Sequence, residues 1–284
     1  MKSEQLAWLI KRHGIEMTHI SHGSHIGSIL SVADVVAVLY NDVANITPET
    51  VNDENRDRIV LSKGHAGAAI YAALAEKGFF PVEELKTHYA DGSRLSGHVS
   101  HKGIPGVEIS TGSLGHGACM ACGIALNAKI EKMPYFTYAI VGDGECDEGS
   151  IWEMALFANH FKLNQFVVIV DHNKMQSLDF CDNTLALSPF AEKWKAFGWN
   201  VFDIDGHNHD EIRNALNEAK QSVDKPTVII ANTVKGNGIS FMENDILWHY
   251  RFPHEGEEYD GALKELHAVM PEGVVDPYTE EVAK

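Results

Sequence analysis

Five short runs of apolar residues, separated by helix-length segments, limit the folds open to this chain. The runs lack the alternation of apolar and polar residues seen in strands with one wet face, so each is typical of a strand buried on both faces. They occupy residues 58–62, 135–141, 166–170, 199–204 and 227–232. Helical patterns lie at 3–12, 31–41, 67–77, 114–131, 151–161, 189–197 and 210–221. Strands that alternate with helices form βαβ units, so the sequence predicts an α/β protein, a three-layer α/β/α sandwich with a mostly parallel sheet.

The charge and the cysteine content narrow the class of protein. With 23 Lys and Arg against 40 Asp and Glu, the net charge of −17 disfavours nucleic acid as a partner. No apolar run approaches the roughly 20 residues of a membrane-spanning helix, and the N-terminus lacks the features of a signal peptide. Four cysteines in 284 residues fit reduced thiols, and the Cys119/Cys122 pair has no second pair with which to bind zinc. We therefore expect a cytoplasmic protein that acts on small molecules.

Polar, ionisable and glycine residues follow four of the predicted strands. In open parallel sheets, ligands bind beyond the carboxyl ends of the strands. The four segments are Lys63-Gly64-His65, Gly142-Asp143-Gly144-Glu145, Asp171-His172-Asn173-Lys174 and Thr233-Val234-Lys235-Gly236. We expect them to meet at one edge of the sheet and to form the functional site there.

The Gly142-Asp143-Gly144 segment is the most informative of these. Its glycines allow a close backbone approach to an anion, and the helix that follows directs its positive end there. The acid would repel that anion unless a divalent cation lay between them. Alone, the segment is most often a tight turn, but Asn173 follows Asp143 by 30 residues at the next strand end. Together the two residues favour a metal–diphosphate site.

Seven short segments, in order, resemble the N-terminal, diphosphate-binding half of transketolase, a thiamine-diphosphate-dependent family. The resemblance extends from about residue 6 to residue 250. The segments lie at 23–27, 61–66, 95–98, 110–115, 142–149, 171–174 and 235–249. The resemblance implies a thiamine-diphosphate-binding domain at 1–250 and a C-terminal tail at 251–284, which we interpret as a partner contact.

The resemblance assigns a metal role to three residues. Asp143 and Asn173 would ligate Mg²⁺, with Ca²⁺ or Mn²⁺ as alternatives, and the backbone carbonyl of Met175 would be the third protein ligand. Gly142 and Gly144 would lie against the diphosphate.

The resemblance also assigns the remaining cofactor and catalytic roles. Gly112 and Leu114 would contact the aminopyrimidine, and His65 and His249 would contact the diphosphate or line the pocket beside the thiazolium.

His25 and His98, with His249, would face the reacting sugar. Glu148, with Glu153, matches acids that link active sites in the family. For His13, His19, His160, His207 and His209 we expect structural or solvated roles.

The family's pyrimidine and C-terminal domains have no counterpart in this sequence. The resemblance therefore implies a split transketolase, in which a separately encoded C-terminal subunit completes two active sites in an α2β2 assembly. Its reaction would move a two-carbon glycolaldehyde unit from a ketose phosphate to an aldose phosphate through an enamine on thiamine diphosphate.

Three alternatives stay open. The donor could be apulose 4-phosphate or 6-deoxy-6-sulfofructose, because the group that reads the phosphate or sulfonate would belong to the partner. The chain could be the α subunit of a 2-oxo acid dehydrogenase, which also carries Gly-Asp-Gly and Asn, although the segments around His25, His65 and His98 argue against it. It could also be a non-catalytic cofactor-binding subunit.

Overall fold

Five parallel strands form the centre of the fold, in the order β1-β2-β3-β5-β4. The structure is a computed structural model that describes residues 1–279. Its strands are β1 (Arg58–Leu61), β2 (Thr137–Gly142), β3 (Phe166–His172), β4 (Asn200–Asp205) and β5 (Thr227–Asn232). Each predicted strand is present, with its ends within two residues of those expected. The predicted parallel α/β architecture is confirmed.

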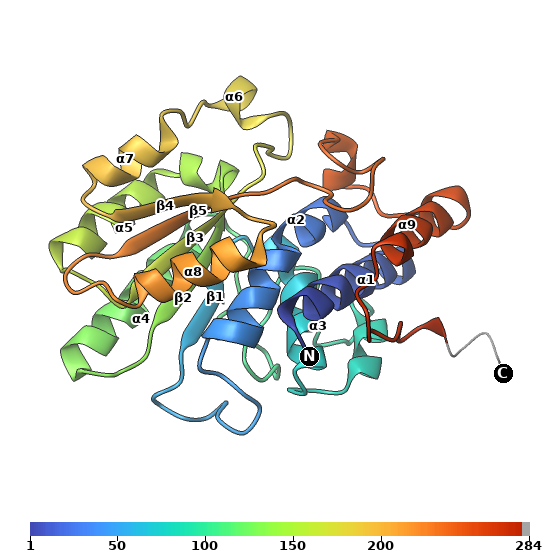
Figure 1. Cartoon of the computed structure of the whole chain (residues 1–284), viewed down its shortest axis with the longest axis horizontal. Helices are drawn as coiled ribbons and strands as arrows, with labels where there is room; N and C mark the ends of the chain where they lie inside the picture. The colour runs from blue at the N-terminus through green and yellow to red at the C-terminus, as the bar shows by residue number, and fades with distance from the viewer. Residues whose placement is uncertain (280–284) are drawn as a thin grey trace.

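Helices cover both faces of this sheet, which gives the expected three layers (Figure 1). On β3, Val167 and Ile169 enter one core, whereas Val168 and Val170 enter the other. The first core is shared with α1 (Ser3–Ser21), α2 (Ile26–Val38), α3 (Gly67–Glu76) and α8 (His209–Ala219). The second is shared with α4 (His116–Glu131), α5 (Gly149–His160) and α7 (Phe190–Ala196). Because alternate residues fill two different cores, the strands read as unbroken apolar runs.

Short helices complete the connections. They are η1 (Leu39–Val43), η2 (Gly64–Ala66), η3 (Val82–Thr87), η4 (Gly144–Asp147), α6 (Cys181–Thr184) and η5 (Ile246–His249). Of these, η2 and η4 directly follow the ends of β1 and β2 and turn the chain at the edge where the site was predicted.

The first helix is longer than its sequence pattern indicates. The expected end near Arg12 is wrong, because α1 continues through Gly14 to Ser21. A Cβ atom on Gly14 would lie 2.6 Å from Cγ2 of Ile29 on α2. The glycine therefore permits close packing of two helices and does not end one. The second helix also begins earlier than expected, at Ile26.

A helix that the sequence analysis did not predict, α9 (Glu257–Ala268), lies in the C-terminal tail and packs against α1. Trp8 Nε1 on α1 donates a hydrogen bond of 2.9 Å to the carbonyl of Leu266. Arg12 forms an ion pair with Asp276 further along the tail. Residues 251–279 are thus joined to the domain, whereas 280–284 of the predicted tail lie outside the described residues.

One stretch of the described chain, Ile26–Val43, is long and apolar enough to cross a membrane by length and composition alone. It comprises α2 and η1, and 89% of it is buried inside the fold. There α2 packs against α1, α3 and α8.

Several residues for which we expected no catalytic role pack within the fold. All four cysteines are free thiols, with Cys122 buried and Cys119 half-buried. His13 is buried, and its Nε2 lies 2.6 Å from Oε1 of Glu76. The buried carboxylate of Asp34 contacts both His207 and His209. The distances from ring nitrogen to carboxylate oxygen are 2.7 and 3.2 Å, respectively. These histidines connect elements of the fold.

Candidate active site

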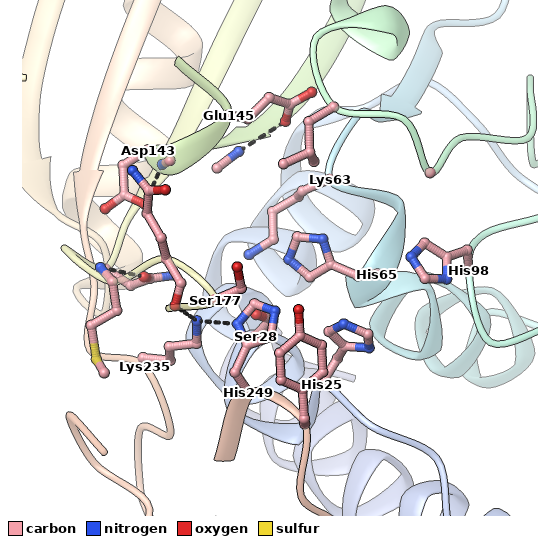
Figure 2. A pocket seen from close by; sticks show the side chains of 18 residues that line it. His25, Ser28, Lys63, His65, His98, Asp143, Glu145, Ser177, Lys235 and His249 are labelled. Carbon is pink, nitrogen blue, oxygen red and sulfur yellow. Dashed lines mark hydrogen bonds between the residues drawn. The ribbon is translucent and has the colours of Figure 1, made fainter. Parts of the chain in front are cut away.

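A cavity of about 220 Å³ lies at the carboxyl ends of β1, β2 and β3. The N-terminal turn of α2 and the segment around η5 close its other sides, and Figure 2 shows their side chains pointing into it. The predicted site residues that line it are His25, His65, His98, Gly112, Leu114, Gly142, Asp143, Gly144, Asn173, Met175 and His249. The strand-end segments therefore meet as expected.

Asp143 and Asn173 are both buried in the wall of this cavity. Asp143 Oδ1 accepts a hydrogen bond of 2.8 Å from the Gly144 N–H, and Oδ2 accepts one from the Lys174 N–H, next to Asn173. Burial, with repulsion from Asp171, raises the pKa of Asp143 to about 7. A cation placed here would offset the cost of that buried charge.

Two further observations fit a polar ligand in this cavity. A Cβ atom on Gly142 would meet no protein atom within 4 Å, so the turn faces open space. Ser28, at the start of α2, is buried with its Oγ lacking a hydrogen-bond partner. Within residues 1–279 no cluster of three or more His, Cys, Asp or Glu side chains could hold a metal. The oxygen donors beside Asp143 that suit a hard cation are the Asn173 amide and the backbone carbonyl of Met175.

Two buried lysines, which the sequence analysis placed at strand ends without a role, also line the cavity. Lys63 forms a buried ion pair with Asp171, which also accepts a hydrogen bond of 2.6 Å from Ser31 Oγ. Burial, followed by repulsion from Lys63, lowers the pKa of Lys235 to about 8. These two ammonium groups, of which Lys63 is paired with Asp171, place positive charge in the cavity wall where a diphosphate could contact it.

Four histidines cluster on the open side of the cavity, with His25 at the centre. Its ring centroid lies 5.1, 5.5 and 5.0 Å from those of His65, His98 and His249. Burial lowers the pKa of His25 to about 4 and that of His249 to about 3, with further lowering by nearby cationic groups. Burial is also the first cause of the lowered pKa of His65 and of His98. The lowered pKa values favour the neutral form of the rings, in which one ring nitrogen donates a hydrogen bond and the other accepts one.

The backbone at His25 is itself unusual. His25 precedes α2 with φ of 77°, a conformation that non-glycine residues rarely adopt. Its N–H donates to the carbonyl of His249 at 2.9 Å. Such a conformation is retained where the surroundings fix it, often at functional sites.

The two glutamates beside the Asp143 turn differ in position. Glu148, predicted to be catalytic, is exposed at the N-cap of α5 and does not line the cavity, so its role in linking active sites stays a prediction. Glu145, which the sequence analysis left without a role, is buried and lines the cavity. The sequence analysis did not predict that Glu145 is buried, because it stands in a run of acidic residues and such runs usually form solvent-exposed faces.

The fold and this cavity define an α/β domain with a buried, polar ligand cavity beyond its strand ends. Residues 3–251 match the family described as transketolase, thiamine diphosphate binding domain. The chain therefore belongs to the transketolase family, as its thiamine diphosphate binding domain.

Similar proteins include separate subunits and longer chains. A 6-deoxy-6-sulfo-D-fructose transketolase subunit of a Clostridium species is 45% identical over 225 residues, which cover 79% of this chain and 82% of that protein. One subunit of the apulose-4-phosphate transketolase of Actinobacillus succinogenes is 42% identical, covering 86% of this chain and 88% of the relative.

Among solved structures, transketolase from Leishmania mexicana superposes with a TM-score of 0.87 at 28% identity. The match covers 94% of this chain but only 41% of that longer chain.

Proposed function

We propose that this chain is the N-terminal, diphosphate-binding subunit of a split transketolase, and that it acts only with a separate C-terminal subunit. The two would transfer a two-carbon glycolaldehyde unit from a ketose to an aldose. Two relatives of nearly the same extent are named as subunits, whereas the transketolase of Leishmania mexicana is more than twice as long. The short extent of the subunit relatives and the greater length of the Leishmania mexicana chain both support a function divided between two chains.

The observation that carries the proposal is one cavity with two chemically distinct ends. One end, at the sheet edge, would bind a metal cation and an anion. It is formed by Asp143, Asn173 and the two buried lysines. Neutral histidines form a hydrogen-bonding site on the open side. A ligand with a diphosphate at one end and a reactive ring at the other fits this division.

The cofactor contacts are divided among the residues that line the cavity. Asp143, Asn173 and the Met175 carbonyl would hold Mg²⁺, with Ca²⁺ or Mn²⁺ as alternatives, because all-oxygen sites suit these hard cations. Gly142, Gly144, Lys63, Lys235, His65 and Ser28 would surround the diphosphate, and Gly112 and Leu114 would contact the aminopyrimidine. Thiamine diphosphate, when bound, supplies a nucleophilic carbon and an electron sink for the reaction.

The histidines would handle the sugar. The Nδ1 atom of His25 lies 2.7 Å from Ser24 Oγ, which leaves Nε2 for a hydroxyl or carbonyl oxygen of the donor. His98 is exposed at the mouth of the cavity, where an incoming sugar first enters. Neutral rings can accept a proton from one group and donate to another within a single turnover.

A separate partner subunit would supply the remaining parts of the family's active site, including the pyrimidine-binding domain. We propose an α2β2 assembly in which residues 251–279 contribute a contact to the partner. Glu148, exposed beside the cavity, would connect the two active sites. A cytoplasmic location fits the four free cysteines, because reducing compartments keep thiols free.

The donor is proposed to be a ketose with a terminal phosphate or sulfonate. The named substrates of the two relatives carry one group or the other, apulose 4-phosphate and 6-deoxy-6-sulfo-D-fructose. Both are therefore candidates beside xylulose 5-phosphate. The dehydrogenase alternative predicts turnover of an acid donor such as pyruvate, whereas this proposal predicts none.

The test is reconstitution of the full chain with its partner subunit. Thiamine diphosphate binding is measured by calorimetry with and without Mg²⁺, and ketol transfer is measured with the three sugar donors and with pyruvate. We expect metal-dependent binding, transfer from at least one sugar and no turnover of pyruvate. Turnover by this chain alone, turnover of pyruvate, or coenzyme binding by the assembled pair without sugar transfer would contradict the proposal.

A matched pair of variants tests the metal site. Asp143→Asn removes the buried carboxylate assigned to the metal and should abolish metal-dependent coenzyme binding. Asp57→Asn is the control, because Asp57 is also buried and also accepts backbone N–H bonds, from Asn45 and Phe136, but does not line the cavity. Equal binding by both variants would disprove the metal assignment.

A further inference from the structure

One buried carboxylate, that of Glu145, joins three segments around the cavity. Glu145 lies on η4, two residues after Asp143, and is 1% exposed. Its Oε1 accepts a hydrogen bond of 2.8 Å from the Gly115 N–H and another from Ser62 Oγ, and its Oε2 accepts one of 3.1 Å from the Gly142 N–H. Figure 2 shows Glu145 beside the turn that carries Asp143.

The three donors belong to different parts of the site. Gly142 is the last residue of β2 and begins the turn to Asp143. Gly115 is the N-cap of α4 and follows Gly112 and Leu114 in sequence. Ser62 follows β1, and its Oγ also accepts a hydrogen bond of 2.9 Å from the Ala118 N–H on α4. The carboxylate therefore ties the diphosphate turn (residues 142–144) to the loop at residues 112–115.

Only an acceptor with two oxygens can satisfy this arrangement. All three partners donate, and an ionised carboxylate accepts at both oxygens, whereas a Gln side chain would direct an NH₂ group at one of the donors. The loop has little freedom to adjust, because Gly115 has φ of 81° and a Cβ there would lie 2.3 Å from Ser150 Oγ. Loss of one oxygen would leave a buried N–H or hydroxyl without a partner.

We propose that Glu145 is a positioning residue that fixes the spacing between the diphosphate turn and the loop at residues 112–115. Glu145 acts through the two segments that it joins. The inference rests on the proposed function, in which Gly112 and Leu114 contact the aminopyrimidine and Gly142 and Gly144 contact the diphosphate. A ligand that reaches both segments needs this spacing, whereas a ligand that occupies only the diphosphate turn does not.

The experiment compares a ligand that reaches both segments with one that reaches only the diphosphate turn. Thiamine diphosphate spans both segments, and inorganic pyrophosphate with Mg²⁺ occupies only the diphosphate end. Dissociation constants are measured by calorimetry for the wild-type chain and for Glu145→Gln, each assembled with the partner subunit. We expect Glu145→Gln to weaken thiamine diphosphate at least tenfold more than it weakens pyrophosphate.

Two further variants keep the test decisive. Glu108→Gln is the control for the loss of a half-buried carboxylate, because Glu108 pairs with Arg56 and does not line the cavity. It should leave both dissociation constants unchanged. If Glu145→Gln does not fold, Ser62→Ala removes one donor and keeps the charge, and it should give the same split between ligands in smaller measure.

The outcomes separate this inference from the proposed function. Equal weakening of both ligands by Glu145→Gln, or no weakening of either, would overturn the positioning role while leaving the coenzyme assignment intact. If the wild-type assembly binds neither pyrophosphate nor thiamine diphosphate, the proposed function itself is wrong.

Discussion

The Nζ atom of Lys235 lies 2.7 Å from Nδ1 of His249 in the buried wall of the cavity. An ammonium group only donates, so Nδ1 of the ring accepts and the ring proton resides on Nε2. Burial lowers both pKa values, that of His249 to about 3, with the Lys235 charge as a further cause, and that of Lys235 to about 8. The pair therefore gives the ligand a neutral N–H donor and a cation that titrates near physiological pH.

Thiamine diphosphate affinity should fall as the pH rises above 8. Burial lowers the pKa of Lys235 to about 8, and the diphosphate favours the protonated form, so binding at higher pH requires proton uptake. The dissociation constant should rise by up to roughly tenfold per pH unit until the pKa of the bound state is reached. Calorimetry between pH 7 and pH 10 measures this slope. Lys235→Arg should flatten it, because a guanidinium stays charged throughout; an unchanged slope in that variant would show that another group titrates.

Gly142→Ala should weaken coenzyme binding without destabilising the chain. The added methyl group would meet no protein atom within 4 Å, so it projects into the space assigned to the diphosphate. We expect at least tenfold weaker thiamine diphosphate binding and an unchanged Tm of the apoprotein. Gly123→Ala is the matched control, because a Cβ at this α4 position also meets nothing within 4 Å but lies outside the cavity. It should stabilise the helix by about 0.5–1 kcal/mol and leave binding unchanged.

His98→Ala should lower turnover more than it lowers coenzyme affinity. His98 is exposed at the mouth of the cavity, and its ring centroid lies 6.5 Å from that of His65, so it can meet the sugar without supporting the diphosphate. Loss of a proton-transferring or hydrogen-bonding group costs about 10²–10⁴-fold in rate. Steady-state kinetics of the reconstituted pair gives kcat, and calorimetry gives the dissociation constant of thiamine diphosphate. A large loss of coenzyme affinity with normal kcat would place His98 at the cofactor.

The strand ends could be predicted from sequence because two local signals agree there. Unbroken apolar runs locate parallel strands, and the residues that follow them meet at one edge whatever the rest of the fold. That reasoning placed Asp143 and Asn173 in the same wall, 30 residues apart in sequence, as the structure has them. It needed no knowledge of side-chain contacts.

The contacts missed by sequence analysis depend on tertiary packing. Lys63 meets Asp171 across 108 residues, and nothing local in either segment marks a buried ion pair. Gly14 has the sequence signature of a helix end, but the Ile29 side chain on α2 requires a small residue there. The α9 helix has few apolar residues of its own, and its buried Ala262 and Leu266 acquire partners only when it packs on α1. Such features are visible only after the elements have been assembled.

Acid should destabilise the apoprotein in part through His88, which lies outside the cavity. His88 is 4% exposed, its Nε2 has no hydrogen-bond partner in the described chain, and burial lowers its pKa to about 4. The unfolded chain takes up a proton near pH 6.5 while the folded chain does not, so stability is lost as the pH falls from 6.5 to about 4 and levels off below that. The difference between pKa values of 6.5 and about 4 corresponds to about 3 kcal/mol. His88→Phe should remove this contribution, because a ring of similar shape replaces an imidazole whose Nε2 is already unpaired. Urea unfolding of both proteins between pH 7 and pH 4 measures the difference, and parallel stability curves would show that His88 is protonated in the folded state.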